Sequence, residues 1–301
     1  PHEPSRRQRQ MCIRDRTGVK AHTLRIWEQR YKFVKPKRTH TNIRYYTDDD
    51  MKKILNISIL NKYGLRIGRI AKMDKHAIKE NINNISQTNE AFKHELHINK
   101  LATCMLELDE QGFEKIITTC ILQIGLEKTM FAIIYPFLQK IGVMWLTNRA
   151  NPAQEHFIVN LIRQKLIVAI DGQVVKPNNN SRKYLLFLPE NELHEISLLF
   201  LCYLLKVRHH IVTYLGANVP FSNIVPIANK SEAEYLYTIF TAPIDKKEIF
   251  QYLKTLAQKV PDKQIVVSGS QVHKLDIAKL PYNVTVLKSL DEIMQFVENP
   301  L

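Results

Sequence analysis

The stretch KYLLFLPENELHEIS, residues 183–197, decides how the C-terminal third of this chain folds. An apolar run, YLLFL, is followed by a polar loop that holds three glutamates and one histidine, His194, and then by an apolar segment. A short, continuous apolar run bounded by turn residues is typical of a strand that is buried on both faces. The sequence therefore predicts a strand, a loop that carries His194, and a helix.

The same alternation continues to the end of the chain, where the apolar runs HIVTYLG, EYLYTIF, QIVVSG and NVTVL alternate with helical segments. Five apolar strands separated by helices predict a Rossmann-like, doubly wound parallel sheet with helices on both faces, over residues 179–301. Ligands bind such sheets at the carboxyl ends of the strands. The residues that fall at those ends are His194, Thr238, Ser268 and Gly269. No GxGxxG follows the first strand, which argues against a dinucleotide site.

The composition describes an ordinary globular protein, because 45% of the 301 residues are hydrophobic and 24% are charged. The four cysteines lie far apart without a CxxC pair, which argues against a disulfide framework or a zinc ribbon and fits a reducing compartment. No apolar run approaches the ~20 residues of a membrane helix, and no secretory signal is readable. We expect a soluble, cytoplasmic protein of several domains.

The net charge of +14 is concentrated at one end of the chain. The first 80 residues hold 21 of the 43 Lys and Arg residues but only 8 of the 29 Asp and Glu residues. Such a distribution is typical of a nucleic-acid-binding module attached to nearly neutral domains, and equally of a basic solvated surface. Charge alone leaves both interpretations open.

The order of elements in residues 17–74 favours the nucleic-acid module. TGVKAHTLRIWEQRY places Leu24, Trp27 and Tyr31 at helical spacing, so these three are predicted to pack in a core while basic side chains face elsewhere. The polar tip PKRTHTN then lies between two short apolar stretches, as in a β-ribbon or wing, and a second, well-capped helix follows.

This order resembles the winged helix-turn-helix of the MerR family of transcriptional regulators, including the phrases TG-V-x-x-HTLRxWE and NxRYY. The resemblance implies a double-stranded DNA operator as partner, with the helix around Lys20 to Arg30 in the major groove and the wing on the phosphate backbone. The residues that it assigns to DNA binding are Lys20, His22, Thr23, Arg25, Arg30, Arg38, Asn42, Arg44 and Tyr45.

The segments on either side of this module are less regular. Residues 1–16 lack the apolar spacing of the first helix of the motif, and we interpret them as a disordered leader, native or added by cloning. Residues 75–95 are polar and are predicted to be a linker with fragmentary helix and no long coiled coil. Residues 96–178 repeat apolar positions at i, i+3 and i+4 and are predicted to form a helical bundle.

The bundle holds Trp145 and, after nine intervening residues, Glu155 and His156. Taken alone, this pattern indicates a packed indole and a surface pair. Pro152 stands at a position that suits the first turn of a helix. The tryptophan and the Glu-His pair indicate a functional site only when they are considered together with the C-terminal segment.

The C-terminal segment is similar to the cobalamin-binding α/β domain, whose signature is DxHxxG, then SxL, then GG. The counterparts are Glu192-Leu-His194-Glu-Ile-Ser197, Thr238-Ile-Phe240 and Ser268-Gly269, with 44 positions from His194 to Thr238 and 30 from there to Ser268. Glu192 and Ser197 stand where the signature has Asp and Gly, and the added Cβ at Ser197 must be accommodated. From about residue 17 to 298 the chain resembles the light-sensing, adenosylcobalamin-dependent MerR regulators of the CarH and LitR type.

This resemblance implies a homo-oligomer, dimer or tetramer, whose operator binding depends on adenosylcobalamin or another cobalamin and is not enzymatic. His194 would be the lower axial ligand of cobalt, with Glu192 as the hydrogen-bond acceptor behind it. Trp145 would cover the upper ligand, and His156 would replace that ligand after light breaks the cobalt–carbon bond. The cofactor-binding residues that it assigns are Trp145, Glu155, His156, Glu192, His194, Ser197, Thr238, Phe240, Ser268 and Gly269.

Three alternatives remain at this stage. The α/β domain could serve oligomerisation without a cofactor, or it could sense a different small molecule. The chain could also be a corrinoid-carrying methyltransferase subunit, but a basic N-terminal module and the lack of a further catalytic domain argue against that.

Overall fold

A computed structural model describes residues 19–38, 42, 44–146 and 151–300. The chain divides into two compact units, 1–158 and 159–301. The division falls within one long helix, α10 (Pro152–Asp171). The predicted leader, residues 1–16, lies outside the described residues.

The described part of the first unit begins with a helix and a wing, and a second pair of helices follows. Its elements are α2 (Ala21–Tyr31), β1 (Lys37–Arg38), β2 (Arg44–Tyr45), α3 (Asp48–Lys62) and α4 (Ile67–Ile70). The two short strands pair antiparallel, as predicted for the wing. Helix α3 starts at a capping box, in which the Thr47 side chain accepts from the Asp50 amide and the Asp50 carboxylate accepts from the Thr47 amide.

A single apolar core holds this module together. Leu24 and Trp27 of α2 are buried, as expected from their helical spacing, while Tyr31 packs against the core from its edge. The same core includes Ile78 and Phe92, which lie beyond the predicted boundary of the module at residue 74.

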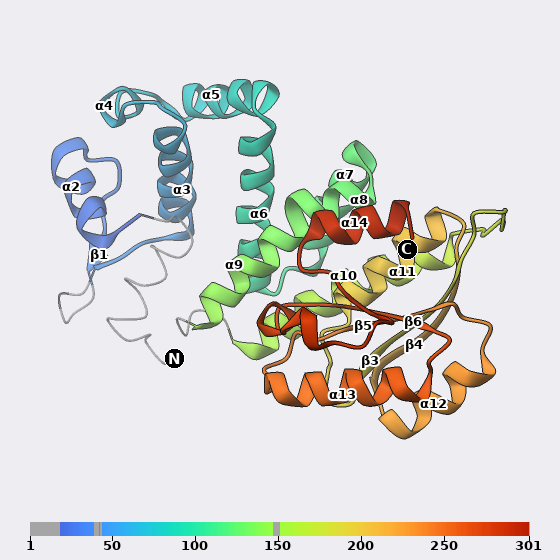
Figure 1. The fold of residues 1–301 in the computed structure, drawn as a ribbon. Helices are drawn as coiled ribbons and strands as arrows, with labels where there is room; N and C mark the ends of the chain where they lie inside the picture. Colours follow the sequence, from blue (N-terminus) through green and yellow to red (C-terminus); the bar gives the residue numbers. More distant parts are fainter. Residues whose placement is uncertain (1–18, 39–41, 43, 147–150, 301) are drawn as a thin grey trace. The chain divides into compact units, whose positions relative to one another are not determined.

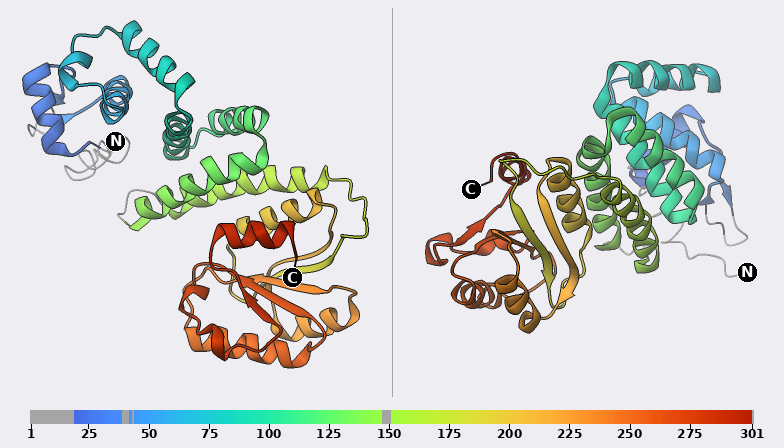
Figure 2. Two further views of the ribbon diagram at one scale, coloured as in Figure 1. Left: turned by 45° about the horizontal axis from the view of Figure 1, so that its top comes forward. Right: turned by 90° about the vertical axis from the view of Figure 1, so that its right-hand side faces the viewer.

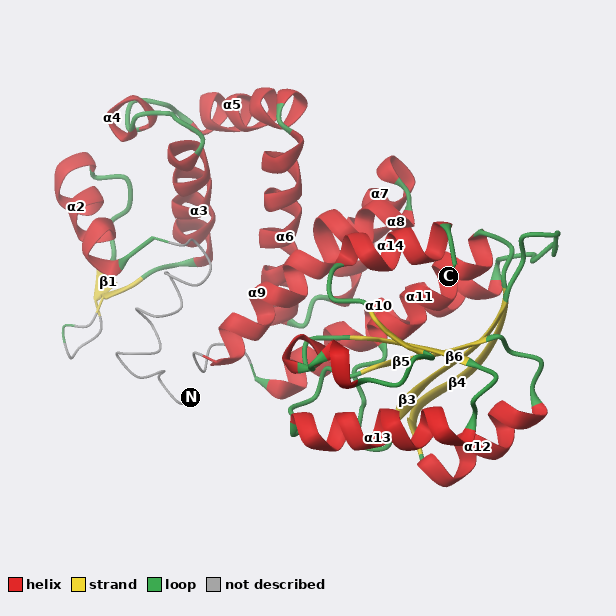
Figure 3. Ribbon diagram, in the orientation of Figure 1, coloured by secondary structure: helices red, strands yellow, loops and turns green. Residues whose placement is uncertain are grey.

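The segment predicted as a linker with fragmentary helix is instead regular helix. Figure 3 shows α5 (Lys75–Thr88) and α6 (Glu90–Glu107) as separate helices. Ile78 and Ile82, four residues apart, and Phe92 bury their side chains in the core of the helix-turn-helix. The fragmentary-helix expectation was wrong because a few well-spaced apolar residues stabilise a polar helix once tertiary packing is available.

The remaining helices of the first unit form the predicted bundle. They are α7 (Glu110–Ile124), α8 (Leu126–Thr129), the π-helical turn η1 (Met130–Ile134), α9 (Tyr135–Leu146) and the start of α10. The π-helical turn ends two residues before Pro136, which has no N–H to donate to the preceding turn. Pro152 occupies the first position of α10, as predicted.

The second unit is the predicted five-stranded parallel sheet. Its strands are β3 (Lys183–Pro189), β4 (Ile211–Val219), β5 (Tyr235–Ile239), β6 (Gln264–Ser268) and β7 (Val284–Val286). Their spatial order is β4-β3-β5-β6-β7, and every pairing is parallel. The chain runs from β3 outward to β4 and then returns to the other side of β3, so the order reverses between β3 and β5. This reversal is a topological switch point, where open α/β sheets bind ligands.

Helices cover both faces of this sheet (Figure 1). They are α11 (Ile196–Val207) and α14 (Leu290–Glu298) on one face and α12 (Phe221–Lys230) and α13 (Lys246–Lys259) on the other. The left view of Figure 2 shows α14, in red, and α13, in orange, on opposite sides of the strands. Strands β3, β5 and β6 are buried on both faces, which explains their continuous apolar runs. Within the part of the chain that the structure describes, no helix is both long and apolar enough to cross a membrane.

Candidate nucleic-acid and cofactor sites

The polar face of α2 is exposed, as a nucleic-acid-reading helix requires. Lys20, His22, Arg25 and Arg30 are exposed and Thr23 is half-buried. Because Leu24 and Trp27 occupy the core face, packing directs the basic face outward. The helix can therefore present these side chains to a major groove without rearranging.

The wing is tied to α2 through Glu28. The Glu28 carboxylate accepts a hydrogen bond from the Tyr46 hydroxyl and pairs with Arg44 Nε at 3.4 Å. Burial, and then this hydrogen bond, raise the pKa of Tyr46 well above its usual value, so the phenol stays protonated. Arg44, predicted to contact DNA, thus also has an internal partner.

Two residues of the wing make a local contact with each other. Arg38 Nη1 donates to Asn42 Oδ1 at 2.5 Å, and Asn42 adopts a left-handed conformation with φ of 62°. Asn is among the few residues that adopt this conformation at low cost. Tyr45 lies in β2, and its side chain is outside the described part of the structure.

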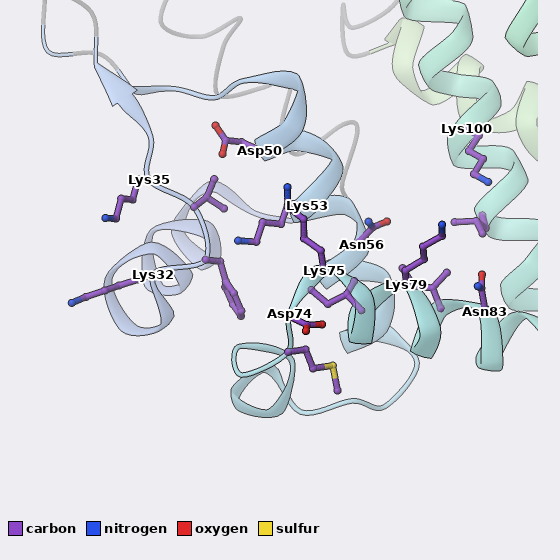
Figure 4. A pocket seen from close by; sticks show the side chains of 16 residues that line it. Lys32, Lys35, Asp50, Lys53, Asn56, Asp74, Lys75, Lys79, Asn83 and Lys100 are labelled. Carbon is purple, nitrogen blue, oxygen red and sulfur yellow. The ribbon is translucent and has the colours of Figure 1, made fainter.

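A lysine-lined hollow lies beside the helix-turn-helix (Figure 4). Its apolar side includes Phe33, Ile78 and Ile82. Its two carboxylates, Asp50 and Asp74, both act as helix caps. The lysines around it are Lys32, Lys35, Lys53, Lys75, Lys79 and Lys100. This excess of cations extends the positive potential of the DNA-binding module from α2 to α5 and α6.

In the second unit, Glu192 and His194 lie in the loop that joins β3 to α11. Glu192 Oε1 lies 2.5 Å from His194 Nδ1 and accepts the His194 amide at 3.0 Å. Glu192 is buried, whereas the His194 side chain is 56% exposed. A proton on Nδ1 that is shared with the carboxylate leaves the basic lone pair of the imidazole on Nε2, which is the arrangement of a metal-binding histidine.

Glu192 also joins two loops across the switch point. Its Oε2 accepts the backbone amides of Thr241, at 2.6 Å, and Ala242, at 2.7 Å, which follow β5. Burial alone would raise the pKa of Glu192, but the hydrogen bonds from His194, Ala242 and Thr241 outweigh it and lower this pKa to about 2. The carboxylate is therefore ionised at neutral pH and fixes the orientation of His194.

Thr238 and Ser268 lie at the carboxyl ends of β5 and β6 and are both buried. The Ser268 hydroxyl accepts a hydrogen bond from the Tyr237 hydroxyl at 2.9 Å. Thr238 Oγ1 has no hydrogen-bond partner among the residues that the structure describes. A buried, unsatisfied hydroxyl costs free energy, and a polar group of a ligand can relieve that cost.

Gly269 and Phe240 meet backbone to backbone where β5 and β6 end. Gly269 has φ of 109°, and a Cβ there would lie 2.3 Å from the Phe240 carbonyl oxygen. Only glycine fits this position, so the fold itself explains the residue. The Phe240 side chain belongs to the core and packs against Tyr252, so it does not face a ligand.

Ser197 is the second residue of α11 and is half-buried. The structure thus accommodates a side chain where the cobalamin signature has glycine.

The residues assigned to the upper face of the cofactor all belong to the first unit. Trp145 is the penultimate residue of α9, and its side chain is outside the described part. Glu155 is half-buried and His156 exposed on the first turns of α10. This end of α10 is anchored by Gln154, whose side-chain amide donates to the Leu106 carbonyl at 3.1 Å.

The residues present fit a corrinoid at the lower site. A corrin ring brings its own four nitrogen ligands, so the protein needs to supply one oriented imidazole, and His194 has that orientation. Within the described ranges, no three His, Cys, Asp or Glu residues cluster as a complete metal site would require. The Thr241 and Ala242 amides were not predicted from the sequence, although they directly follow the Thr-Ile-Phe motif.

Comparisons with known proteins agree with both parts of the architecture. Residues 13–77 match the profile of the MerR HTH family regulatory protein, and residues 97–169 match that of the B12 binding domain. The second match falls on the helical bundle rather than on the sheet. These matches confirm the predicted combination of a MerR-type domain with a B12-binding domain.

Two transcriptional repressors from Myxococcus xanthus are similar to this chain. The HTH-type transcriptional repressor CarH is 24% identical over 213 residues, which cover 69% of this chain and 70% of CarH. The HTH-type transcriptional repressor CarA is 27% identical over 206 residues, which cover 68% of this chain and 66% of CarA.

A solved structure supports the fold. The monomethylamine corrinoid protein of Methanosarcina barkeri superposes with a TM-score of 0.54 at 14% identity, covering 68% of this chain and 99% of that protein. At this level of identity the likeness concerns the fold alone, a helical bundle followed by a parallel α/β sheet.

Proposed function

We propose that this chain, which combines a MerR-type helix-turn-helix domain with a B12-binding domain, is a transcriptional regulator controlled by a bound cobalamin. The observation that carries the proposal is the His194–Glu192 pair at the switch point between β3 and β5. Glu192 fixes the imidazole before any cofactor arrives, because its four hydrogen bonds all come from the protein itself. Such preorganisation removes part of the ordering cost of binding.

The finer proposal is that the cofactor is adenosylcobalamin and that light is the signal. Adenosylcobalamin, when bound, supplies a cobalt–carbon bond that light can break. His194 would hold the lower face, Trp145 would cover the upper face, and Glu155 and His156 would lie beside it on α10. His156 would provide a second imidazole once the upper position is vacated. These roles follow the resemblance to light-sensing regulators of the CarH and LitR type.

The cofactor can control DNA binding only if it interacts differently with two assemblies of the protein. We propose that adenosylcobalamin favours a DNA-binding homo-oligomer in the dark and that illumination reverses this. Contacts of Lys20, Arg25, Arg30 and Arg38 with phosphates would make operator binding depend steeply on salt.

The test is dark reconstitution with adenosylcobalamin, followed by the visible spectrum and the mass in solution before and after illumination. We expect bound cofactor with a protein imidazole ligand, and a change of mass on illumination. His194→Ala should lose the imidazole-ligated spectrum and bind cobalamin at least ~10-fold more weakly. His76→Ala is the matched control, because His76 is an exposed histidine on α5.

The two claims can fail separately. A protein that stays colourless would refute cobalamin control and favour a cofactor-free oligomerisation module. A coloured protein whose mass does not respond to light would refute only the light switch. The cytoplasmic location proposed from the sequence is tested by fractionating cells that express the full chain.

A further inference from the structure

A second glutamate, next to His194 in the chain, is also held by specific partners. Glu195 Oε1 accepts the Tyr214 hydroxyl of β4 at 2.8 Å, and Glu195 Oε2 pairs with Arg163 Nε of α10 at 2.7 Å. The Glu195 side chain is only 16% exposed. Each carboxylate oxygen therefore binds a different structural element.

Glu195 also shapes the backbone on the C-terminal side of His194. Its amide donates to the Leu193 carbonyl at 2.8 Å, and its own carbonyl accepts the Leu199 amide at 2.9 Å, which opens α11. His194 thus lies between two anchored glutamates. Glu192 joins it to the loop after β5, and Glu195 joins it to β4 and α10.

Arg163 lies on the same face of α10 as His156. The two are seven residues apart, which is about two turns of helix, or ~10 Å along the axis. One continuous helix therefore carries the imidazole assigned to the upper face of the cofactor and the guanidinium that contacts the lower loop.

The two contacts of Glu195 differ in strength. Arg163 is 48% exposed, so its ion pair is screened and easily exchanged for water. Tyr214 is half-buried, and burial, followed by its hydrogen bond to Glu195, raises the pKa of its phenol, so the hydroxyl remains a donor. The Tyr214 contact is therefore the more shielded of the two, and the Arg163 contact is the more weakened by solvent.

We infer that Glu195 is a positioning residue that links α10 to the His194 loop, so that a shift of α10 changes how His194 is presented to a cobalamin. The inference rests on the proposed function. It adds a route by which a change at one end of α10 reaches the lower ligand. It also predicts that Arg163, which carries none of the assigned cofactor roles, affects cofactor binding.

The experiment compares Arg163→Gln with Arg163→Lys in the full chain, and with Arg182→Gln as the matched control. Arg182 is 45% exposed and pairs with Glu234 at 3.8 Å, at the opposite end of β3. The measurements are the dissociation constant for adenosylcobalamin in the dark, the melting temperature of the cofactor-free protein, and the NMR signal of the His194 ring in that protein.

We expect Arg163→Gln to weaken adenosylcobalamin binding about two- to fivefold and to shift the His194 ring signal. Its melting temperature should stay within a few degrees of that of the unchanged protein. Arg163→Lys should recover part of the affinity, and Arg182→Gln should match the unchanged protein. A purely structural role of the ion pair would alter the melting temperature without moving the His194 signal selectively.

Unchanged affinity and an unmoved His194 signal in Arg163→Gln would overturn the inference. If the unchanged protein does not bind cobalamin, the proposed function fails. The His194 signal of the cofactor-free protein then still decides whether Arg163 and His194 are linked.

Discussion

The two candidate sites of this chain are built on opposite principles. The lower cofactor site depends on one buried carboxylate, Glu192, whose four hydrogen bonds fix His194 and two backbone loops. The DNA-binding module instead presents many exposed cations, including Lys20, Arg25 and Arg30, whose side chains face solvent. Removing one member of a buried hydrogen-bond network leaves its partners unsatisfied, whereas removing one of many exposed charges lowers the binding affinity only a little.

The largest effect should come from Glu192→Ala. The His194, Thr241 and Ala242 amides would lose their acceptor, so the free energy of unfolding should fall by about 2 to 4 kcal/mol. Cobalamin affinity should fall at least ~10-fold, because Glu192 is the acceptor that holds both the ring and the amide of His194. Chemical unfolding and equilibrium binding measure the two effects.

Glu190→Ala is the control for this change, since Glu190 is an exposed carboxylate in the same loop. Equal stability of the two variants would mean that water replaces Glu192 at the amides, and the contrast between the two sites would then disappear.

A smaller loss should follow from Gly269→Ala. The new methyl group would meet the Phe240 carbonyl at 2.3 Å in a backbone conformation with φ of 109°. We expect a loss of about 1 to 3 kcal/mol in the free energy of unfolding, even without cofactor. The control is Gly142→Ala in α9, where nothing lies within 4 Å of the added Cβ, and alanine there should be neutral or slightly stabilising. A melting temperature of Gly269→Ala as high as that of the control would contradict the close backbone contact.

The sequence predicts the fold well where periodicity is strong. The five apolar runs, the wing and the amphipathic α2 all form as expected, because burial on both faces or on one face leaves a clear pattern. The prediction failed over residues 75–95, which form α5 and the start of α6 and where Ile78, Ile82 and Phe92 bury their side chains among many polar residues. Such helices gain their stability from a partner core that lies far away in the sequence.

The site could be predicted only to the level of side chains. His194 and Glu192 stand out by spacing, whereas the Thr241 and Ala242 amides carry no signal, since every residue has an amide. Glu195 was visible as one of three glutamates, but its partners Tyr214 and Arg163 come from other elements, and only the fold brings them together.

At the DNA-binding module, Arg25→Gln should have a graded effect. Arg25 is exposed on α2, and loss of one phosphate contact should lower the slope of log affinity against log salt by about 0.9. Operator affinity should fall a few-fold at low salt and less at high salt. Fluorescence anisotropy over a salt series measures this slope, with Lys254→Gln, an exposed lysine of α13, as the control. Equal slopes for both variants would remove Arg25 from the DNA interface.

The smallest effect should come from a lysine of the hollow, Lys100, acting on His97. Burial, and then the charges of Lys100 and Lys93, lower the pKa of His97 to about 4. Between about pH 6.5 and 4, His97 is therefore protonated in the unfolded chain but neutral in the folded chain. The free energy of unfolding falls as the pH drops through this range. Lys100→Gln should raise the pKa of His97 and reduce this loss slightly.

Burial is the larger cause, so the pKa of His97 in Lys100→Gln should still lie below 6.5. NMR titration of the ring measures it directly, and Lys115→Gln, an exposed lysine of α7, provides the control. A return of His97 to its ordinary pKa would mean that the cations, rather than burial, dominate this part of the first unit. The charges of the lysines would then act together on a buried group of the bundle. Their effects could no longer be treated as independent contributions of separate exposed charges.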